Sequence, residues 1–115
     1  MTVYNQGDCV LIPFPFTDFS TIKQRPALII SSNRFNKTHQ DVIVTAITSH
    51  VPEKLTSSDY QLILSDQQSG GLPKTSIVKI GKIVTIDQRL IHKKLGSLSP
   101  ATLQNILVRV HQIIG

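Results

Sequence analysis

Short apolar runs separated by turn residues dominate the first ninety residues of the chain. Each run is four to six residues long and rich in Val, Ile and Leu, which is typical of strands. The runs are Cys9–Ile12, Ala27–Ile30, Val42–Ile47, Tyr60–Leu64, Ile77–Ile80 and Ile83–Ile86, and a further extended piece is expected near Lys94–Leu95. Six or more short strands predict a mainly β fold, either a small barrel or a sandwich.

Two features refine this prediction. Ala27–Ile30 is apolar at every position and follows Pro26, which indicates a strand buried on both faces. Gly81 separates the run at Ile77–Ile80 from the run at Ile83–Ile86, and it predicts a tight turn or a bulge.

The end of the chain predicts one amphipathic α-helix. Ser99 is a good N-cap, and Pro100 suits the first helical position. The residues that recur at helical spacing are Leu103, Ile106, Leu107, Val110, Ile113 and Ile114. We expect this stripe to pack on the strands or on a partner, and we expect a single helical turn at Asn33–Asn36.

The segment Pro13–Gln24 is long for a connection between two strands, and it holds Phe14, Phe16 and Phe19. Long loops in compact domains are often functional. The three rings have two interpretations, which are compatible with each other. They can form a small satellite core, or they can stack on nucleic-acid bases at the edge of the loop.

Charge is distributed unevenly along the 115 residues. The formal net charge is +5, yet residues 1–73 hold five basic and six acidic residues, whereas residues 74–115 hold seven basic residues and one acid. A basic segment points to a polyanion or an acidic protein as partner, although a solvated face of ordinary lysines remains an equal alternative.

Composition excludes several classes of protein. Cys9 is the only cysteine, so neither a disulfide framework nor a zinc site of thiolates is expected, and Cys9 itself fits a small buried residue. The seven acids form no cluster for a two-metal site, and no glycine-rich phosphate-binding motif is present. No apolar run approaches a membrane span and the N-terminus lacks a signal peptide, so we expect a cytoplasmic protein of one domain.

The order of short motifs resembles one family. Arg25-Pro26-Ala27-Leu28-Ile29-Ile30-Ser31 follows the long loop, Ala46-Ile47-Thr48-Ser49 ends the third run, and Thr85-Ile86-Asp87 ends the sixth. Together these blocks resemble the MazF/PemK family, the growth-inhibiting toxins of bacterial and archaeal toxin–antitoxin pairs, over nearly the whole chain.

The resemblance implies a single domain over residues 1–115, with an SH3-like, MazF/CcdB-type β-barrel and a C-terminal α-helix. It implies a homodimer that cuts single-stranded RNA at short sequences and inhibits translation and growth, with no metal and no other cofactor. It also implies a cognate antitoxin protein, a segment of which occupies the RNA groove.

By resemblance, Arg25 and Thr48 match the catalytic positions. RNA carries its own nucleophile, the 2′-hydroxyl, so the protein has to stabilise charge on the phosphate and to move protons. A guanidinium stays protonated at neutral pH, so we expect Arg25 to stabilise charge and donate a proton, more than to act as a literal base. Thr48 would orient the phosphate or the 2′-hydroxyl.

Further residues are expected to contact the RNA. These are Phe16, Thr17, Ser20, Lys23, Ser49, Lys74, Ser76 and Lys82. Lys82 departs from the family, which often has Gln there, and a lysine offers a point charge in place of paired amide groups. The RNA sequence that is recognised therefore stays open.

Three alternatives compete with this interpretation. Arg25 can be a structural anchor of the long loop that pairs with Asp8 or Asp18. Two histidines can also perform RNA transesterification, and among the four histidines His50 follows Thr48 closely enough to reach the same edge. At the level of the whole protein, the alternative is a non-catalytic CcdB-like toxin or a nucleic-acid-binding barrel that acts by partner binding.

Overall fold

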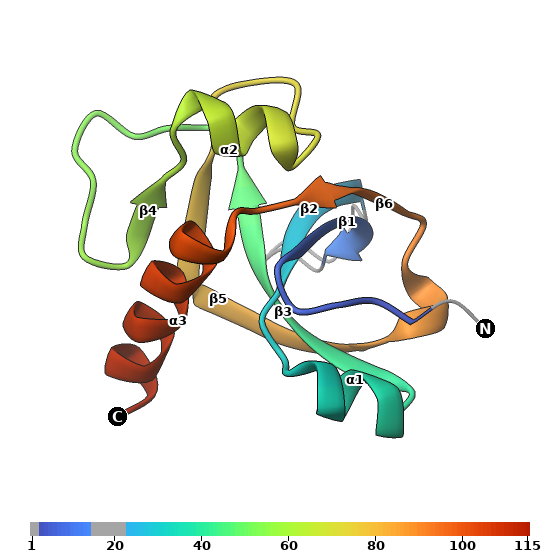
Figure 1. Ribbon diagram of the computed structural model, residues 1–115. Coiled ribbons are helices and arrows are strands. Elements are labelled where there is room, and N and C mark those ends of the chain that lie inside the picture. The colour runs from blue at the N-terminus through green and yellow to red at the C-terminus, as the bar shows by residue number, and fades with distance from the viewer. Residues whose placement is uncertain (1–2, 15–22) are drawn as a thin grey trace.

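Antiparallel strands and short helices make up the computed structural model, which describes residues 3–14 and 23–115 (Figure 1). The strands are β1 (Asp8–Phe14), β2 (Lys23–Ile29), β3 (Asp41–Thr48), β4 (Asp59–Gln61), β5 (Ile77–Asp87) and β6 (Lys93–Ser97). The α-helices are α1 (Asn33–Thr38), α2 (Leu64–Ser69) and α3 (Pro100–Ile114), and a 3₁₀ turn, η1 (Gln88–Leu90), follows β5.

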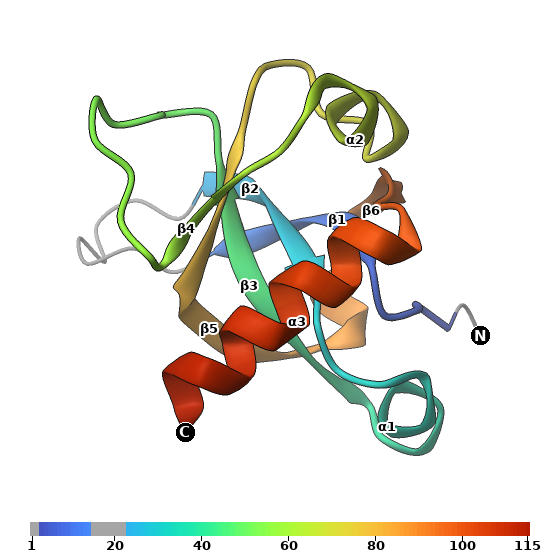
Figure 2. The same cartoon turned by 60° about the vertical axis from the view of Figure 1, so that its left-hand side comes forward.

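The six strands form one curved sheet in the order β4-β5-β3-β2-β1-β6, with every neighbouring pair antiparallel. The predicted mainly β class with a C-terminal helix is confirmed. Among the described residues the sheet is open, because β4 and β6 are its two edges and do not pair with each other. Figure 2 shows α3 crossing one side of this curved sheet.

Two apolar layers explain why the strand runs are continuous. One layer packs α3 on the sheet, and it includes Cys9, Leu28, Val78, Ile80, Ile106 and Val110. The other layer lines the opposite face, and it includes Val10, Ile12, Ala27, Ile29, Val42 and Val44. Successive residues of a strand point to opposite faces, so a strand covered on both sides is apolar at every position, as predicted for Ala27–Ile30.

Cys9 lies within the layer under α3 and is fully buried, which confirms the expectation of a small buried residue. Burial raises the pKa of its thiol to about 12, with the nearby Asp8 and Asp66 adding to the effect. The thiol therefore stays protonated at neutral pH, in which form it is a poor nucleophile.

The two runs on either side of Gly81 form a single strand, β5, with the predicted bulge between them. Thr45 of β3 pairs with Ile83, and the next residue, Ala46, pairs with Lys79, so residues 80–82 bulge out of the β3–β5 ladder. The buried Thr45 hydroxyl donates to the Lys79 carbonyl at 2.6 Å, which satisfies a backbone group at the bulge.

The prediction of one strand over Tyr60–Leu64 is wrong. Strand β4 ends at Gln61 and helix α2 begins at Leu64. The buried carboxylate of Asp66 in α2 accepts hydrogen bonds from the Ser99 and Thr102 hydroxyls at the start of α3. These contacts join residues more than thirty positions apart, and a local pattern does not reveal them.

Helix α3 begins as predicted, with Ser99 as N-cap and Pro100 in the first turn. The Ser99 hydroxyl accepts a hydrogen bond from the Thr102 backbone N–H at 3.4 Å. The turn expected at Asn33–Asn36 is the six-residue helix α1. In the described part of the chain, no helix has the length and apolar character needed to cross a membrane.

Replacing Ile106 with alanine should lower the free energy of unfolding by about 2–5 kcal/mol, because the side chain is fully buried between α3 and the sheet. Gln104→Ala, on the exposed side of the same helix, is the matched control and should change stability by less than about 1 kcal/mol. Urea denaturation followed by circular dichroism measures both. Equal losses for the two variants would contradict the packing of α3 described above.

Candidate active site

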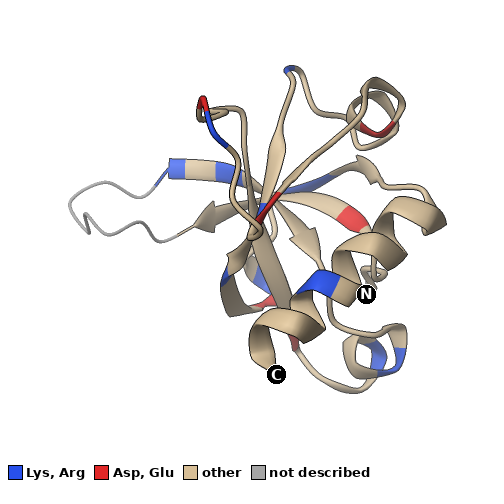
Figure 3. Cartoon of the chain, turned by 90° about the vertical axis from the view of Figure 1, so that its left-hand side faces the viewer, with Lys and Arg blue, Asp and Glu red and all other residues tan. Residues whose placement is uncertain are grey.

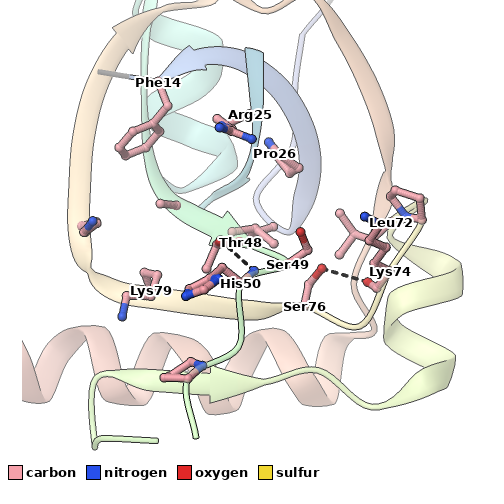
Figure 4. Close-up of a pocket in the computed structure, with 15 residues that line it drawn as sticks. Phe14, Arg25, Pro26, Thr48, Ser49, His50, Leu72, Lys74, Ser76 and Lys79 are labelled. Carbon is pink, nitrogen blue, oxygen red and sulfur yellow. Dashed lines mark hydrogen bonds between the residues drawn. The ribbon is translucent and has the colours of Figure 1, made fainter. Parts of the chain in front are cut away.

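The main cleft lies where β2 and β3 part. Their ladder stops at the pair Ala27 and Ala46, beside Pro26, which has no backbone N–H to continue it. Beyond this point, the ends of β2 and β3 enclose a cleft of about 460 Å³ together with the segment that follows β3 and the segment that precedes β5 (Figure 4). Its lining residues are Phe14, Arg25, Pro26, Ala46, Ile47, Thr48, Ser49, His50, Pro52, Leu72, Pro73, Lys74, Ser76, Lys79 and Lys82.

Strand register brings together residues that are distant in sequence. Arg25 and Thr48 each lie two residues beyond the last β2–β3 pair, Ala27 and Ala46, on the two parted strands. On the other side of β3, Thr48 pairs with Ile77 of β5, and one further step sets Ser49 opposite Ser76. Figure 4 shows these side chains around one opening, with Arg25 on one side and the hydroxyl residues on the other.

The hydroxyl groups are held by local hydrogen bonds. The Thr48 Oγ1 accepts from the His50 backbone N–H at 3.1 Å, which leaves its own hydrogen to donate to a ligand. The buried Ser76 hydroxyl donates to the Lys74 carbonyl at 2.9 Å, so its oxygen is left as a hydrogen-bond acceptor. Thr48 and Ser76 therefore offer complementary hydrogen-bonding groups.

The cleft is strongly basic. Its lining includes Arg25, Lys74, Lys79 and Lys82, and no described residue that lines it is an Asp or Glu. Lys79 is paired with Asp59 just outside the lining, at 2.8 Å. Figure 3 shows blue positions at the start of β2, next to the grey trace. A concave surface with this excess of positive charge favours an anionic ligand.

Five of the seven basic residues after position 73 fall into two groups. Lys74, Lys79 and Lys82 reach the cleft. Elsewhere in the described residues, Arg89 pairs with Asp87 at 2.8 Å and Lys94 with Asp8 at 3.3 Å. Asp8, one of the two anchors considered for Arg25, is thus the partner of Lys94, and Asp18 lies outside the described residues.

Six of the ten predicted site residues line this cleft, namely Arg25, Thr48, Ser49, Lys74, Ser76 and Lys82. Lys23 begins β2 and is exposed, but it is not part of the lining. Phe16, Thr17 and Ser20 lie outside the described residues, as does Phe19. His50, the competing candidate, is exposed and lines the cleft too.

Sequence reasoning missed several lining residues. Phe14 was noted only as a loop aromatic, whereas it ends β1 and is buried against both the core and the cleft. No local sequence pattern marks Lys79 as a cleft residue, because its position depends on the β5 bulge and on the pairing with Asp59. Its hydrogen bond is also the main cause that lowers the pKa of the Asp59 carboxyl, followed by the Thr56 backbone N–H.

A second cleft of about 450 Å³ lies at the opposite end of the β3–β5 ladder. Its lining includes Tyr4, His39, Gln88 and Arg89, and the Arg89 guanidinium there is occupied by Asp87. Neither cleft holds a metal-binding cluster, since the described residues include no group of three or more His, Cys, Asp or Glu side chains that could bind an ion.

Nearly the whole chain matches one protein family. A family model described as "PemK-like, MazF-like toxin of type II toxin-antitoxin system" matches residues 5–114. No curated protein matches the sequence.

Solved structures match the whole chain. MazF from Deinococcus radiodurans has a TM-score of 0.79 at 18% identity, covering 100% of this chain and 99% of its own. An endoribonuclease from a mycobacterial species has a TM-score of 0.77 at 23% identity, with coverages of 100% and 94%. A mycobacterial endoribonuclease in complex with its cognate antitoxin has a TM-score of 0.76 at 22% identity, with coverages of 100% and 96%.

Proposed function

The chain belongs to the family of PemK-like, MazF-like toxins of type II toxin–antitoxin systems, and on that premise we propose that it is an endoribonuclease that cuts single-stranded RNA in the cleft around Arg25 and Thr48. One observation carries the proposal. The cleft beside β2, β3 and β5 gathers a guanidinium, two lysines without carboxylate partners among the described residues, and three hydroxyl groups in one opening.

The reaction follows from the substrate. The RNA 2′-oxygen attacks the adjacent phosphorus, the bond from phosphorus to the 5′-oxygen breaks, and the two products carry a 2′,3′-cyclic phosphate and a 5′-hydroxyl. The 2′-oxygen loses its proton to solvent water, and the departing 5′-oxygen takes a proton from the Arg25 guanidinium, which solvent water then restores. Because the nucleophile belongs to the RNA and a cation can stabilise the transition state, we propose that the chemistry needs no metal.

Arg25 is the principal stabiliser of charge in this scheme. Its planar guanidinium can donate to two phosphate oxygens at once, and it is placed to give a proton to the departing 5′-oxygen. Thr48, which lines the same cleft, supplies a hydroxyl donor whose oxygen is held by the His50 N–H. Lys74 and Lys82 bind neighbouring phosphates, and the buried Ser76 oxygen accepts a hydrogen bond from a base or a 2′-hydroxyl.

We also propose the partners that this function requires. A cognate antitoxin with an acidic segment would neutralise the cleft, since the lining residues are cationic and the same groups that hold phosphates can hold carboxylates. A homodimer is supported by exposed apolar residues on α3, namely Val108, Ile113 and Ile114. The toxin would act in the cytoplasm, where mRNA is found.

Purified protein incubated with single-stranded RNA in EDTA should cut it at defined positions and leave 5′-hydroxyl ends. Mapping the product ends by kinase labelling and by mass spectrometry measures this. Products with a 5′-phosphate, or loss of cleavage in EDTA that Mg²⁺ restores, would contradict the proposed chemistry.

Arg25→Ala should lower the cleavage rate by about 100-fold or more, because one preorganised donor to the transition state is typically worth this much. Thr48→Val should lower it by about 10-fold to 100-fold, whereas Thr48→Ser, which keeps the hydroxyl, should stay near wild type. Arg34→Ala, on the exposed side of α1, is the control for loss of one arginine. Initial rates on a fixed RNA compare all four.

The same rates test the histidine alternative. If His50→Ala loses as much activity as Arg25→Ala, the acid–base role belongs to His50 and the assignment to Arg25 is wrong. Full toxicity of Arg25→Ala when it is expressed alone would show that the catalytic role of Arg25 is wrong.

A further inference from the structure

Lys79 differs from the other lysines of the cleft. Lys74 and Lys82 line the opening with no carboxylate of the described residues beside them. The Lys79 ammonium lies 2.8 Å from Asp59 Oδ1, on the neighbouring strand. The two residues are directly paired in the β4–β5 ladder, and their side chains share one face of the sheet.

Burial and hydrogen bonds fix the position of the Asp59 carboxylate. Its side chain is 2% exposed, whereas the Lys79 side chain is 31% exposed. The other oxygen, Oδ2, accepts from the Thr56 backbone N–H at 3.0 Å and from the Thr56 hydroxyl at 3.2 Å. Both oxygens are therefore occupied, and the carboxylate cannot follow the lysine if the lysine turns into the cleft.

We propose that Asp59 restrains Lys79 and thereby lowers the affinity of the cleft for RNA. The affinity is lower than it would be if all four cations of the cleft bound phosphates. The inference rests on the proposed function, since it assumes that the cleft binds RNA. Asp59 is a positioning residue in this account, because it acts on the ligand only through Lys79.

The physical basis is the release of counterions. A lysine that neutralises an RNA phosphate adds to binding and steepens its salt dependence, whereas a lysine already neutralised by a carboxylate adds little to either. The Asp59–Lys79 pair therefore leaves Lys74 and Lys82 as the lysines of the cleft that act on the phosphates. Weaker binding lets product leave and lets an antitoxin segment compete.

The Asp59→Asn substitution removes the negative charge of the side chain and nearly keeps its shape. Its single carbonyl oxygen can accept from Thr56 or from Lys79, while its NH₂ group must face the other donor. The two fixed Thr56 donors favour the carbonyl oxygen on their side, which turns the NH₂ group toward the Lys79 ammonium. Lys79 should then leave the pair and turn toward the cleft that it already lines.

The experiment measures binding to a single-stranded 2′-O-methyl RNA oligonucleotide, which lacks the nucleophile and is not cut. Its affinity for wild type, Asp59→Asn and Asp59→Asn/Lys79→Met is measured over a range of salt concentrations. Asp59→Asn should bind at least about threefold more tightly at low salt, with a slope of log K against log salt steeper by about 0.7. The double variant should return to the wild-type slope or below it.

An unchanged or shallower slope for Asp59→Asn would overturn the proposal, and so would a steep slope that persists in the double variant. If wild type binds no RNA at all, the proposed function itself fails, which is a different result. Circular dichroism checks that each variant is folded.

If Asp59→Asn does not fold, reductive methylation of the lysines in the wild-type protein tests the proposal instead. Lys79 should react more slowly than Lys74 and Lys82, and bound oligonucleotide should protect Lys74 and Lys82 while leaving the slow rate of Lys79 unchanged. Equal reactivity of the three lysines without RNA, or protection of Lys79 by RNA, would overturn the proposal.

Discussion

The antiparallel register of β3 against β2 and β5 determines where the cleft residues of β3 lie relative to the neighbouring strands. A slip of one residue would turn Thr48 to the opposite face and take it away from Arg25. Both faces of β3 are apolar, so alternation of polar and apolar residues does not fix this register. Thr45 provides a specific constraint, because its buried hydroxyl meets the Lys79 carbonyl only in the observed alignment.

That alignment gives the cleft its shape and its charge. Where the β2–β3 ladder ends beside Pro26, the strands part and leave Arg25 and Thr48 at the opening. The bulge at residues 80–82 lets β5 change direction there, so that Lys79 and Lys82 both reach the same space. Lysines from the basic third of the chain thus converge on an arginine from the near-neutral part.

Much of this fold could be predicted from the sequence, because the responsible signals are local. Apolar runs marked the strands, and Ser99 with Pro100 marked the start of α3. Helix α2 was missed because Asp66 is held by residues at the start of α3, far along the chain. The place of Lys79 was missed for the same reason, since it depends on a bulge and on a carboxylate twenty residues away.

The central claim is that RNA occupies the cleft between the parted ends of β2 and β3. The most direct test is a titration of isotope-labelled protein with a 2′-O-methyl RNA oligonucleotide, followed by the backbone amide signals. The account predicts that Thr48, Ser49 and Ser76 shift while Gln88 and Arg89, in the second cleft, do not. Shifts confined to the second cleft, with Thr48 and Ser76 unmoved, would contradict it.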